Sequence, residues 1–598
     1  MPLTKIFSTV LPRILLAAAV TLAASVLPAW AQAPPAGAEL LPLGEVRAGM
    51  KGCAYTIFAG DQVEKFDLEV IGVLPNFLGP RQAIILVQLL GEKVEHTGVV
   101  AGMSGSPVYL EGKLAGALSL KLGIFTKEAI AGVTPIADVL EPPVSLLEAQ
   151  ENARPVAALP ERFSLRSGIP AAATLERIET PLVFSGFQQS TLREFAPQLA
   201  GYGFVAVQGG TAEARADDGQ LHAGEMAGMV LVQGDASINS ACTVTAVRGD
   251  QVFLCGHPFL GMGKLSLPMA RSRVVTTLSS SLASTKIVNV GGPIGTITAD
   301  HLTAVVGKLG PPPAMIPLDL AVVWGGAERK FHFEVARQQK LTPMLVAIST
   351  LNGLTQNPLY GEGNTLQVSG EVRIKGHASV RIENTYAPGD SGLPDGMPVA
   401  LGILGTVSRL FSNTYEAPDI AGISLRVEGA AGNHSYRIES AWLDASEVAP
   451  GETVRVRVLL RPYRGEPMIR ELSVRVPEQA ARGTTLRVLV SDAEGMNRAA
   501  RGFSPGGAGA EGGLEPFITL LNRERRNDRV YAGLFLPAPT LILEDKEMPN
   551  VPLSQINVLD GKSTPGRAQI LRESLAGEDA VTLGGPVGGA ISLALVVR

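Results

Sequence analysis

The sequence predicts a mainly β protein divided into several domains. Its 598 residues are more than one hydrophobic core usually serves. Glycine (67 residues) and proline (42 residues) are abundant, and long stretches with helical periodicity are few, which favours many short strands joined by turns. Hydrophobic residues make up 46% of the chain and charged residues 18%, a balance typical of folded rather than disordered proteins.

Residues 1–31 have the pattern of a secretory signal peptide. Lys5 and Arg13 supply positive charge, an apolar run covers residues 14–27, and Ala29-Trp30-Ala31 places small residues where a signal peptidase requires them. The apolar run is shorter than a membrane-spanning helix needs. We therefore expect cleavage after Ala31 and a periplasmic or secreted protein with no integral membrane span; an uncleaved anchor is the alternative.

The charge and cysteine patterns exclude several classes of partner. Cleavage removes two positive charges and no acidic residue, which lowers the formal net charge from −5 to −7. With no Lys/Arg-rich run, the mature chain is not expected to bind nucleic acid or anionic lipid surfaces. No Cys-x-x-Cys, His-Glu-x-x-His or Walker-type spacing is present, so no metal or cofactor is expected. Cys242 and Cys255 could form a disulfide across a hairpin, or could remain small buried residues like Cys53.

The chain divides into eight segments. These are the signal peptide (1–31), a flexible Ala/Pro-rich lead-in (32–42), a β-rich block with a serine motif (43–149), a connector with a helix near 191–199 (150–218), a β-rich block with a histidine motif (219–329), a mixed region (330–429), an Ig-like β-sandwich (430–500) and a C-terminal region with a helix near 517–526 (501–598).

Alternating and continuous apolar patterns place the strands within these blocks. In the first block, residues 66–70 alternate between apolar and polar, and residues 83–90 form a mostly apolar run. In the second block, residues 243–247 and 251–255 flank Arg248-Gly249-Asp250 and predict a hairpin. The sandwich rests on short strands at 436–439, 452–460, 472–476 and 485–490, separated by turn residues.

Residues 99–118 carry the most specific chemical pattern in the chain. A strand leads into Gly102-Met103-Ser104-Gly105-Ser106-Pro107, and the chain then leaves and returns as a hairpin through 107–110 and 114–118. A nucleophilic serine needs an exposed hydroxyl and backbone N–H groups directed at the developing oxyanion. Ser104 is the candidate nucleophile, and the N–H groups of Gly102 and Ser104 are the candidate oxyanion donors. Ser106 is a second candidate, and a purely structural hairpin turn is the alternative.

Two stretches resemble the motifs of the SpoIVB serine-peptidase family. Residues 102–107, with Gly112-Lys113-Leu114 and the later segment 130–136, are similar to the family's nucleophile motif and the sequence that follows it. Residues 253–258 contain Gly256-His257 and resemble its Leu-Gly-His motif, whose histidine is the general base. The resemblance covers residues 44–325. It implies an exported serine endopeptidase that acts on proteins or on itself, with Ser104 as nucleophile, His257 as base and two β-barrel-like halves of a permuted chymotrypsin-like fold.

The sequence also departs from that family. Its serine block precedes its histidine block, the reverse of the family order, which a circular permutation would explain because a triad depends on geometry. Leu89 stands where the family has its aspartate, so the orienting acid is open among Asp300, Asp235 and Asp138, and a Ser–His dyad is a further alternative. We find no PDZ domain. These departures support a second hypothesis, a catalytically inactive envelope protein that binds protein partners. Neither hypothesis predicts the oligomeric state.

A second Gly-x-Ser-Gly pattern occurs at residues 389–394, around Ser391. Pro388 precedes it, Asp395-Gly396 follow it, and no apolar strand leaves it. Because a motif needs its structural context, this pattern indicates a surface loop rather than a nucleophile.

Overall fold

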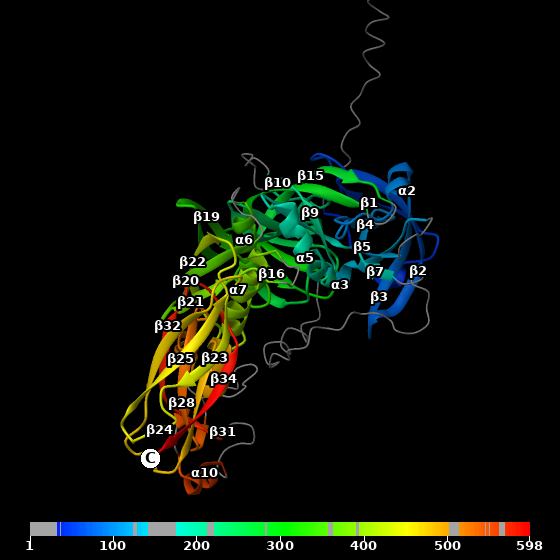
Figure 1. Ribbon diagram of the computed structural model, residues 1–598. Coiled ribbons are helices and arrows are strands. Elements are labelled where there is room, and N and C mark those ends of the chain that lie inside the picture. Colours follow the sequence, from blue (N-terminus) through cyan, green and yellow to red (C-terminus); the bar gives the residue numbers. More distant parts are fainter. Residues whose placement is uncertain are drawn as a thin grey trace, which may run out of the picture.

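The computed structural model is mainly β, as predicted, and it forms an elongated molecule (Figure 1). It describes residues 33–35, 37–122, 128–140, 175–211, 220–280, 284–356, 363–389, 394–501, 513–543, 546–548, 551–560 and 568–598. The predicted signal peptide and Ser391 lie outside these residues. Two barrels occupy one end of the molecule and a β-sandwich occupies the other (Figure 1).

The first barrel is a closed ring of six antiparallel strands, drawn in blue in Figure 1. In ring order the strands are β4 (Pro107–Leu110), β1 (Lys51–Thr56), β2 (Glu64–Gly79), β3 (Gln82–Leu90), β6 (Ile130–Pro135) and β5 (Lys113–Leu122), which pairs again with β4. The strands predicted at 66–70 and 83–90 lie within β2 and β3. Inward-facing side chains such as Leu68, Val87 and Val133 fill the interior. The short elements η1 (Leu43–Glu45), α2 (Glu92–Thr97), α3 (Ile136–Leu140) and β7 (Leu175–Arg177) flank the ring.

A second ring of six antiparallel strands lies within the largest sheet. In ring order these are β11 (Met226–Gly234), β13 (Cys242–Arg248), β14 (Gln251–Leu254), β17 (Val305–Leu309), β16 (Thr285–Asp300) and β15 (Gly263–Leu278), which returns to β11. The predicted hairpin is β13–β14, in which Arg248 pairs with Gln251. The two rings confirm the expected barrel-like halves.

The largest sheet continues beyond the second ring. Its other strands are β8 (Thr180–Ser185), β9 (Phe204–Gln208), β10 (Gly210–Thr211), β12 (Ser237–Ser240), β18 (Ile316–Trp324), β19 (Ala327–Val335), β20 (Asn364–Ile374), β21 (Val380–Tyr386) and β22 (Ile420–Ala431). Helices α6 (Thr342–Thr355) and α7 (Gly396–Phe411) pack on this extension, and α5 (Gln189–Gly201) covers β9. The predicted helix near 191–199 is α5. The strands on either side of it, β8 and β9, also lie within the expected connector, so part of that segment belongs to the sheet.

The two barrels meet through a mixed apolar cluster. Tyr55 and Tyr109 from the first barrel pack edge to face, with ring centroids 5.5 Å apart. They share this cluster with Phe253 and Val306 from the second barrel. This contact brings the turn before β4 against the start of β13 and the end of β14.

The sandwich extends beyond its predicted boundary. Its two sheets are β26 (Met468–Arg475), β25 (Thr453–Pro462), β23 (Tyr436–Leu443) and β33 (Val587–Gly588), facing β24 (Glu447–Val448), β34 (Ala590–Val597), β27 (Thr485–Ser491), β28 (Arg529–Leu536) and β32 (Ser574–Thr582). The four predicted strands are present. Residues 430–500 nevertheless contain only part of the core, because strands from residues 529–597 supply side chains such as Leu534 and Leu595. The remaining elements are α8 (Ala493–Arg501), α9 (Leu514–Asn522), α10 (Leu553–Asp560), β29 (Thr540–Leu543), β30 (Lys546–Met548) and β31 (Ala568–Leu571).

The helix predicted near residues 517–526 is α9, which ends at Asn522. Among the helices of the described residues, none combines the length and the apolar character that crossing a bilayer demands.

Substitutions in β34 test whether this strand completes the sandwich core. Leu595 is fully buried against β27, whereas Ser592 on the same strand is exposed. Leu595→Ala should lower the free energy of unfolding of the sandwich by about 2–5 kcal/mol, as large-to-small core changes do. Ser592→Ala should change it by less than about 0.5 kcal/mol. Equal, small effects of both substitutions on thermal unfolding would show that β34 is not part of the core.

Candidate functional site

The turn that carries Ser104 is held by the second barrel. It lies between α2 and β4, and three of its carbonyl groups accept hydrogen bonds from β13. Thr243 Oγ1 donates to the Gly102 carbonyl (2.9 Å), Thr243 N–H donates to the Ser104 carbonyl (2.8 Å), and Thr245 Oγ1 donates to the Gly105 carbonyl (2.8 Å). These bonds fix the orientation of the turn from outside its own barrel.

Both glycines beside Ser104 are required by geometry. Gly102 has φ +94° and Gly105 has φ +91°, in the region that side chains with a Cβ rarely adopt. A Cβ at Gly105 would lie 2.0 Å from the Thr243 carbonyl oxygen and 2.6 Å from the Cys255 nitrogen. Only glycine therefore allows the turn and the second barrel to approach this closely.

The backbone N–H groups of Gly102 and Ser104 make no hydrogen bond to any described residue. The neighbouring amides are occupied: Met103 donates to Val100, and Gly105 donates to Leu118. Two unoccupied donors therefore flank the candidate nucleophile, at the positions that the sequence predicted for an oxyanion hole. Buried backbone N–H groups are almost always paired, so two free ones in one turn indicate a site for an anionic or strongly polar group.

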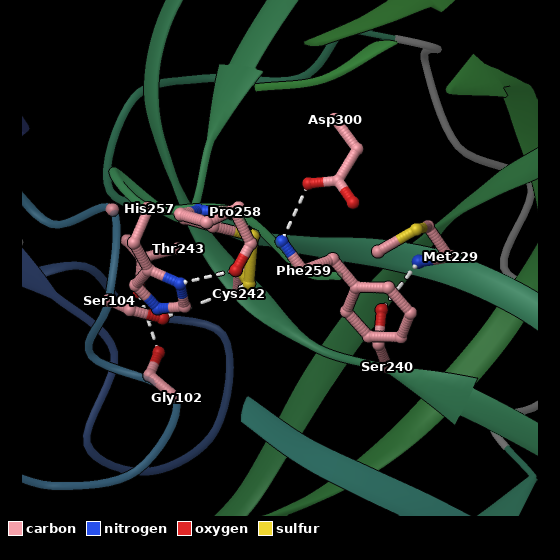
Figure 2. Close-up of a disulfide and its surroundings, with 12 residues drawn as sticks. Gly102, Ser104, Met229, Ser240, Cys242, Thr243, His257, Pro258, Phe259 and Asp300 are labelled. Atoms are coloured by element: carbon pink, nitrogen blue, oxygen red, sulfur yellow. Dashed lines mark hydrogen bonds between the residues drawn. A yellow bond between two sulfur atoms is a disulfide. The ribbon is translucent and has the colours of Figure 1, made fainter. Parts of the chain in front are cut away.

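A disulfide supports the floor of the site (Figure 2). The Cys242–Cys255 bond, one of the two alternatives drawn from the sequence, joins the start of β13 to the residue after β14. The Ser104 hydroxyl lies 3.8 Å from the Cys242 sulfur, its hydrogen-bond partner in this conformation. Next to the disulfide, the Gly256 carbonyl accepts a bond from Thr134 Oγ1 of β6 (2.8 Å), which ties the segment before His257 to the first barrel.

His257 is buried in its neutral form with one ring nitrogen unoccupied. Its Nδ1 lies 2.9 Å from the Pro258 carbonyl oxygen, which can only accept, so Nδ1 carries the proton and Nε2 presents a lone pair. Nε2 is buried and has no hydrogen-bond partner among the described residues. Burial lowers the pKa of His257 to about 4 and the charge of Arg177 adds to this effect, whereas the backbone groups of Pro258 and Ile178 oppose it. The imidazole is therefore a neutral base at pH 7.

None of the three candidate acids binds the imidazole. Asp300 accepts N–H bonds from Phe259 (2.6 Å), Leu260 (2.8 Å) and Met262 (3.1 Å), and so fixes the loop that follows His257. Burial raises the pKa of Asp300, and those amide bonds oppose the rise.

The other two carboxylates have different surroundings. Asp235 accepts from the backbone N–H of His332 (2.7 Å). Asp138 lies in α3, where burial raises its pKa. The Pro258 carbonyl lies at Nδ1, the nitrogen that an orienting acid would bind, and no described carboxylate takes that place. Sequence reasoning offered the dyad but could not identify the Pro258 carbonyl, because a backbone carbonyl leaves no trace in residue identity.

Ser104 and His257 come from opposite barrels to the same junction, beside the disulfide (Figure 2). No hydrogen bond joins them in this conformation, since the Ser104 hydroxyl is directed at sulfur and His257 Nε2 has no partner. Ser104 is fully buried and His257 is 4% exposed. The junction is therefore closed to a large substrate. Ser106, the second candidate nucleophile, donates its hydroxyl to the Met103 carbonyl (2.7 Å) and stabilises the turn.

One buried group near the turn was not predicted. Lys286, on β16, is fully buried, and its Nζ donates to Thr56 Oγ1 (2.6 Å). Burial lowers its pKa to about 7. Within the part of the chain that the structure describes, no group of three or more His, Cys, Asp or Glu residues could hold a metal ion.

Gly105→Ala tests whether the turn must contact β13 this closely. The added Cβ would meet two backbone atoms of the second barrel, so we expect a loss of about 3 kcal/mol in the free energy of unfolding. Gly112→Ala is the matched control, because Gly112 also has positive φ (+82°) but nothing lies within 4 Å of an added Cβ. It should lose about 1 kcal/mol. Chemical denaturation measures both; equal losses would mean that the turn has room to move.

Comparison with protein-family models, with curated proteins and with solved structures gives no match for this chain.

Proposed function

We propose that the protein is a serine hydrolase of the endopeptidase type, with Ser104 as nucleophile and His257 as general base. The observation that carries the proposal is the pair of free N–H groups on Gly102 and Ser104, in a turn whose carbonyls are bound to β13. Donors fixed in advance around a serine are what an oxyanion-forming reaction requires. The likeness of residues 102–107 and 253–258 to SpoIVB peptidase motifs supports the same reaction.

The proposed reaction uses groups already in suitable protonation states. The Ser104 hydroxyl attacks a peptide carbonyl and its proton passes to His257 Nε2, while the former carbonyl oxygen takes the negative charge beside the two free amides. The protonated imidazole then gives its proton to the leaving amine. Water attacks the acyl-enzyme, His257 takes a proton from that water, and the released Ser104 oxygen takes it back. The Pro258 carbonyl holds the imidazole tautomer throughout.

Substrate access requires the junction to open. Ser104 must turn from the Cys242 sulfur towards His257 Nε2, and the burial of both residues must be relieved. We propose a resting enzyme that opens when a protein substrate, or a segment of its own chain, is presented. The signal-peptide pattern supports action in the periplasm or outside the cell.

A catalytically inactive protein that binds other proteins is the second candidate. The complete burial of Ser104 favours it, because an active nucleophile must reach its substrate. The absence of a carboxylate on His257 among the described residues favours it as well.

Labelling with a fluorophosphonate probe separates the two candidates. The probe should modify the wild-type protein each time the junction opens, and Ser104→Ala should abolish labelling because it removes the attacking oxygen. His257→Gln should slow labelling by about 10²–10⁴-fold, the range for loss of a general base. Ser349→Ala, which removes a buried serine hydroxyl in α6, is the control and should label like wild type. An unlabelled but folded wild type would favour the binding protein.

The pH dependence of stability tests the buried neutral state of His257. Its pKa is about 4 in the folded protein and near 6.5 in the unfolded chain, so the unfolded chain gains the proton first as the pH falls. The free energy of unfolding should therefore decrease between pH 6.5 and 4, by up to about 3 kcal/mol from this residue. His257→Gln should show a correspondingly shallower decrease in urea unfolding. Parallel curves would show that the imidazole is accessible to protons.

A further inference from the structure

Lys286 is buried without a negatively charged partner. It is fully inaccessible to solvent, and no carboxylate within the described residues forms an ion pair with it. Its Nζ contacts the Thr56 hydroxyl (2.6 Å) and the Met226 sulfur (3.8 Å). Burying an ammonium group with so few acceptors destabilises the folded state. Packing alone would be served better by methionine or leucine, so the position calls for a functional explanation.

A directed chain of hydroxyl groups leads from this lysine to the turn. Thr243 Oγ1 uses its proton to bind the Gly102 carbonyl (2.9 Å), so it accepts from Thr56 Oγ1, 3.4 Å away. Thr56 has then used its own proton and accepts from Lys286 Nζ. Each bond thus points from the lysine towards Gly102, and a positive charge at the lysine strengthens every step.

The lysine also holds the other side of Gly102. Its backbone N–H donates to the Ala101 carbonyl (3.2 Å), the oxygen of the peptide whose nitrogen is the free Gly102 amide. Its Cδ lies 3.4 Å from the position that a Cβ on Gly102 would take. A hydrogen bond to a peptide oxygen polarises the N–H of the same peptide. Lys286 therefore binds the peptide group before Gly102 directly and the carbonyl of Gly102 through Thr56 and Thr243.

We propose that Lys286 is a positioning residue for the oxyanion-binding turn: its ammonium group, acting through Thr56 and Thr243, holds the Gly102 carbonyl in place so that the free amides of Gly102 and Ser104 can bind the oxyanion. This inference rests on the proposed hydrolase function. Lys286 touches neither substrate nor the reacting atoms. When the lysine loses its proton, Thr56 can donate to the neutral amine, and the chain to Thr243 is broken.

Burial, and not a neighbouring charge, lowers the pKa of Lys286. Ionisable groups on the elements packed around Lys286 are engaged elsewhere. Glu64 on β2 pairs with Lys93, Glu225 before β11 pairs with His222 and Arg271, and Arg273 on β15 pairs with Asp61. With a pKa of about 7, the lysine changes charge within the range where a serine hydrolase is assayed.

The experiment is the rate of fluorophosphonate labelling between pH 5 and 9. The wild-type rate should fall as the pH rises through about 7, since the ammonium group is lost. Lys286→Met should label about 10- to 100-fold more slowly than wild type at pH 6, less than the loss of a direct oxyanion donor, and its rate should not fall through pH 7. Thr56→Val keeps the lysine but breaks the chain, and should show the same two changes.

Thr350→Val is the matched control. This buried threonine in α6 donates to the Val346 carbonyl (2.8 Å), and its replacement should leave the wild-type pH profile unchanged. Thermal unfolding establishes that each variant is folded. If Lys286→Met does not fold, Thr56→Val alone still tests the inference. Wild-type profiles in both Thr56→Val and Lys286→Met would overturn this inference and leave the hydrolase proposal standing. A rate that rises through pH 7 would also overturn it, since Lys286 would then act as a base. A folded wild type that does not label would overturn the hydrolase proposal itself.

Discussion

The hydrogen bonds from Thr243 and Thr245 to the turn around Ser104 are the interaction on which the candidate site depends. They cross from one barrel to the other, and they determine which backbone groups of the turn are occupied. The carbonyls of the turn are bound to β13, whereas the N–H groups of Gly102 and Ser104 bind no described residue. The site is therefore a property of the junction between the barrels.

The groups around this junction are desolvated to an unusual extent. His257 and Lys286 are both buried, and burial lowers the pKa of each. Asp300 is buried as well, and burial raises its pKa although backbone amides of the loop after His257 bind its carboxyl group. In a low-dielectric environment the dipoles of backbone N–H groups act strongly, so they can stabilise a charge that forms during a reaction. A permanent charge without a partner is destabilised in the same environment.

Local patterns predicted the strands well, and long-range partners poorly. The alternation at 66–70 and the hairpin at 243–255 were correct because side-chain period and turn chemistry act within a few residues. The predicted sandwich boundary at residue 500 was wrong. Strand β27 pairs with β28 and β34 across large separations in sequence, and no local pattern records such pairings. Lys286 was missed for a related reason: a single lysine in an alternating strand normally points to solvent, and only the second barrel's position against β1 buries it.

The hydrogen bonds from β13 to the turn also determine when the site can form. The first barrel closes on itself with strands from residues 51–135, so its pairings need nothing from later in the chain. The turn within it acquires its final shape only after residues 243–245 dock, more than a hundred residues further on. Domains generally fold in the order of synthesis. We therefore expect a growing chain to carry Ser104 for some time in a turn without these bonds, and the candidate site to form late, when both barrels are present.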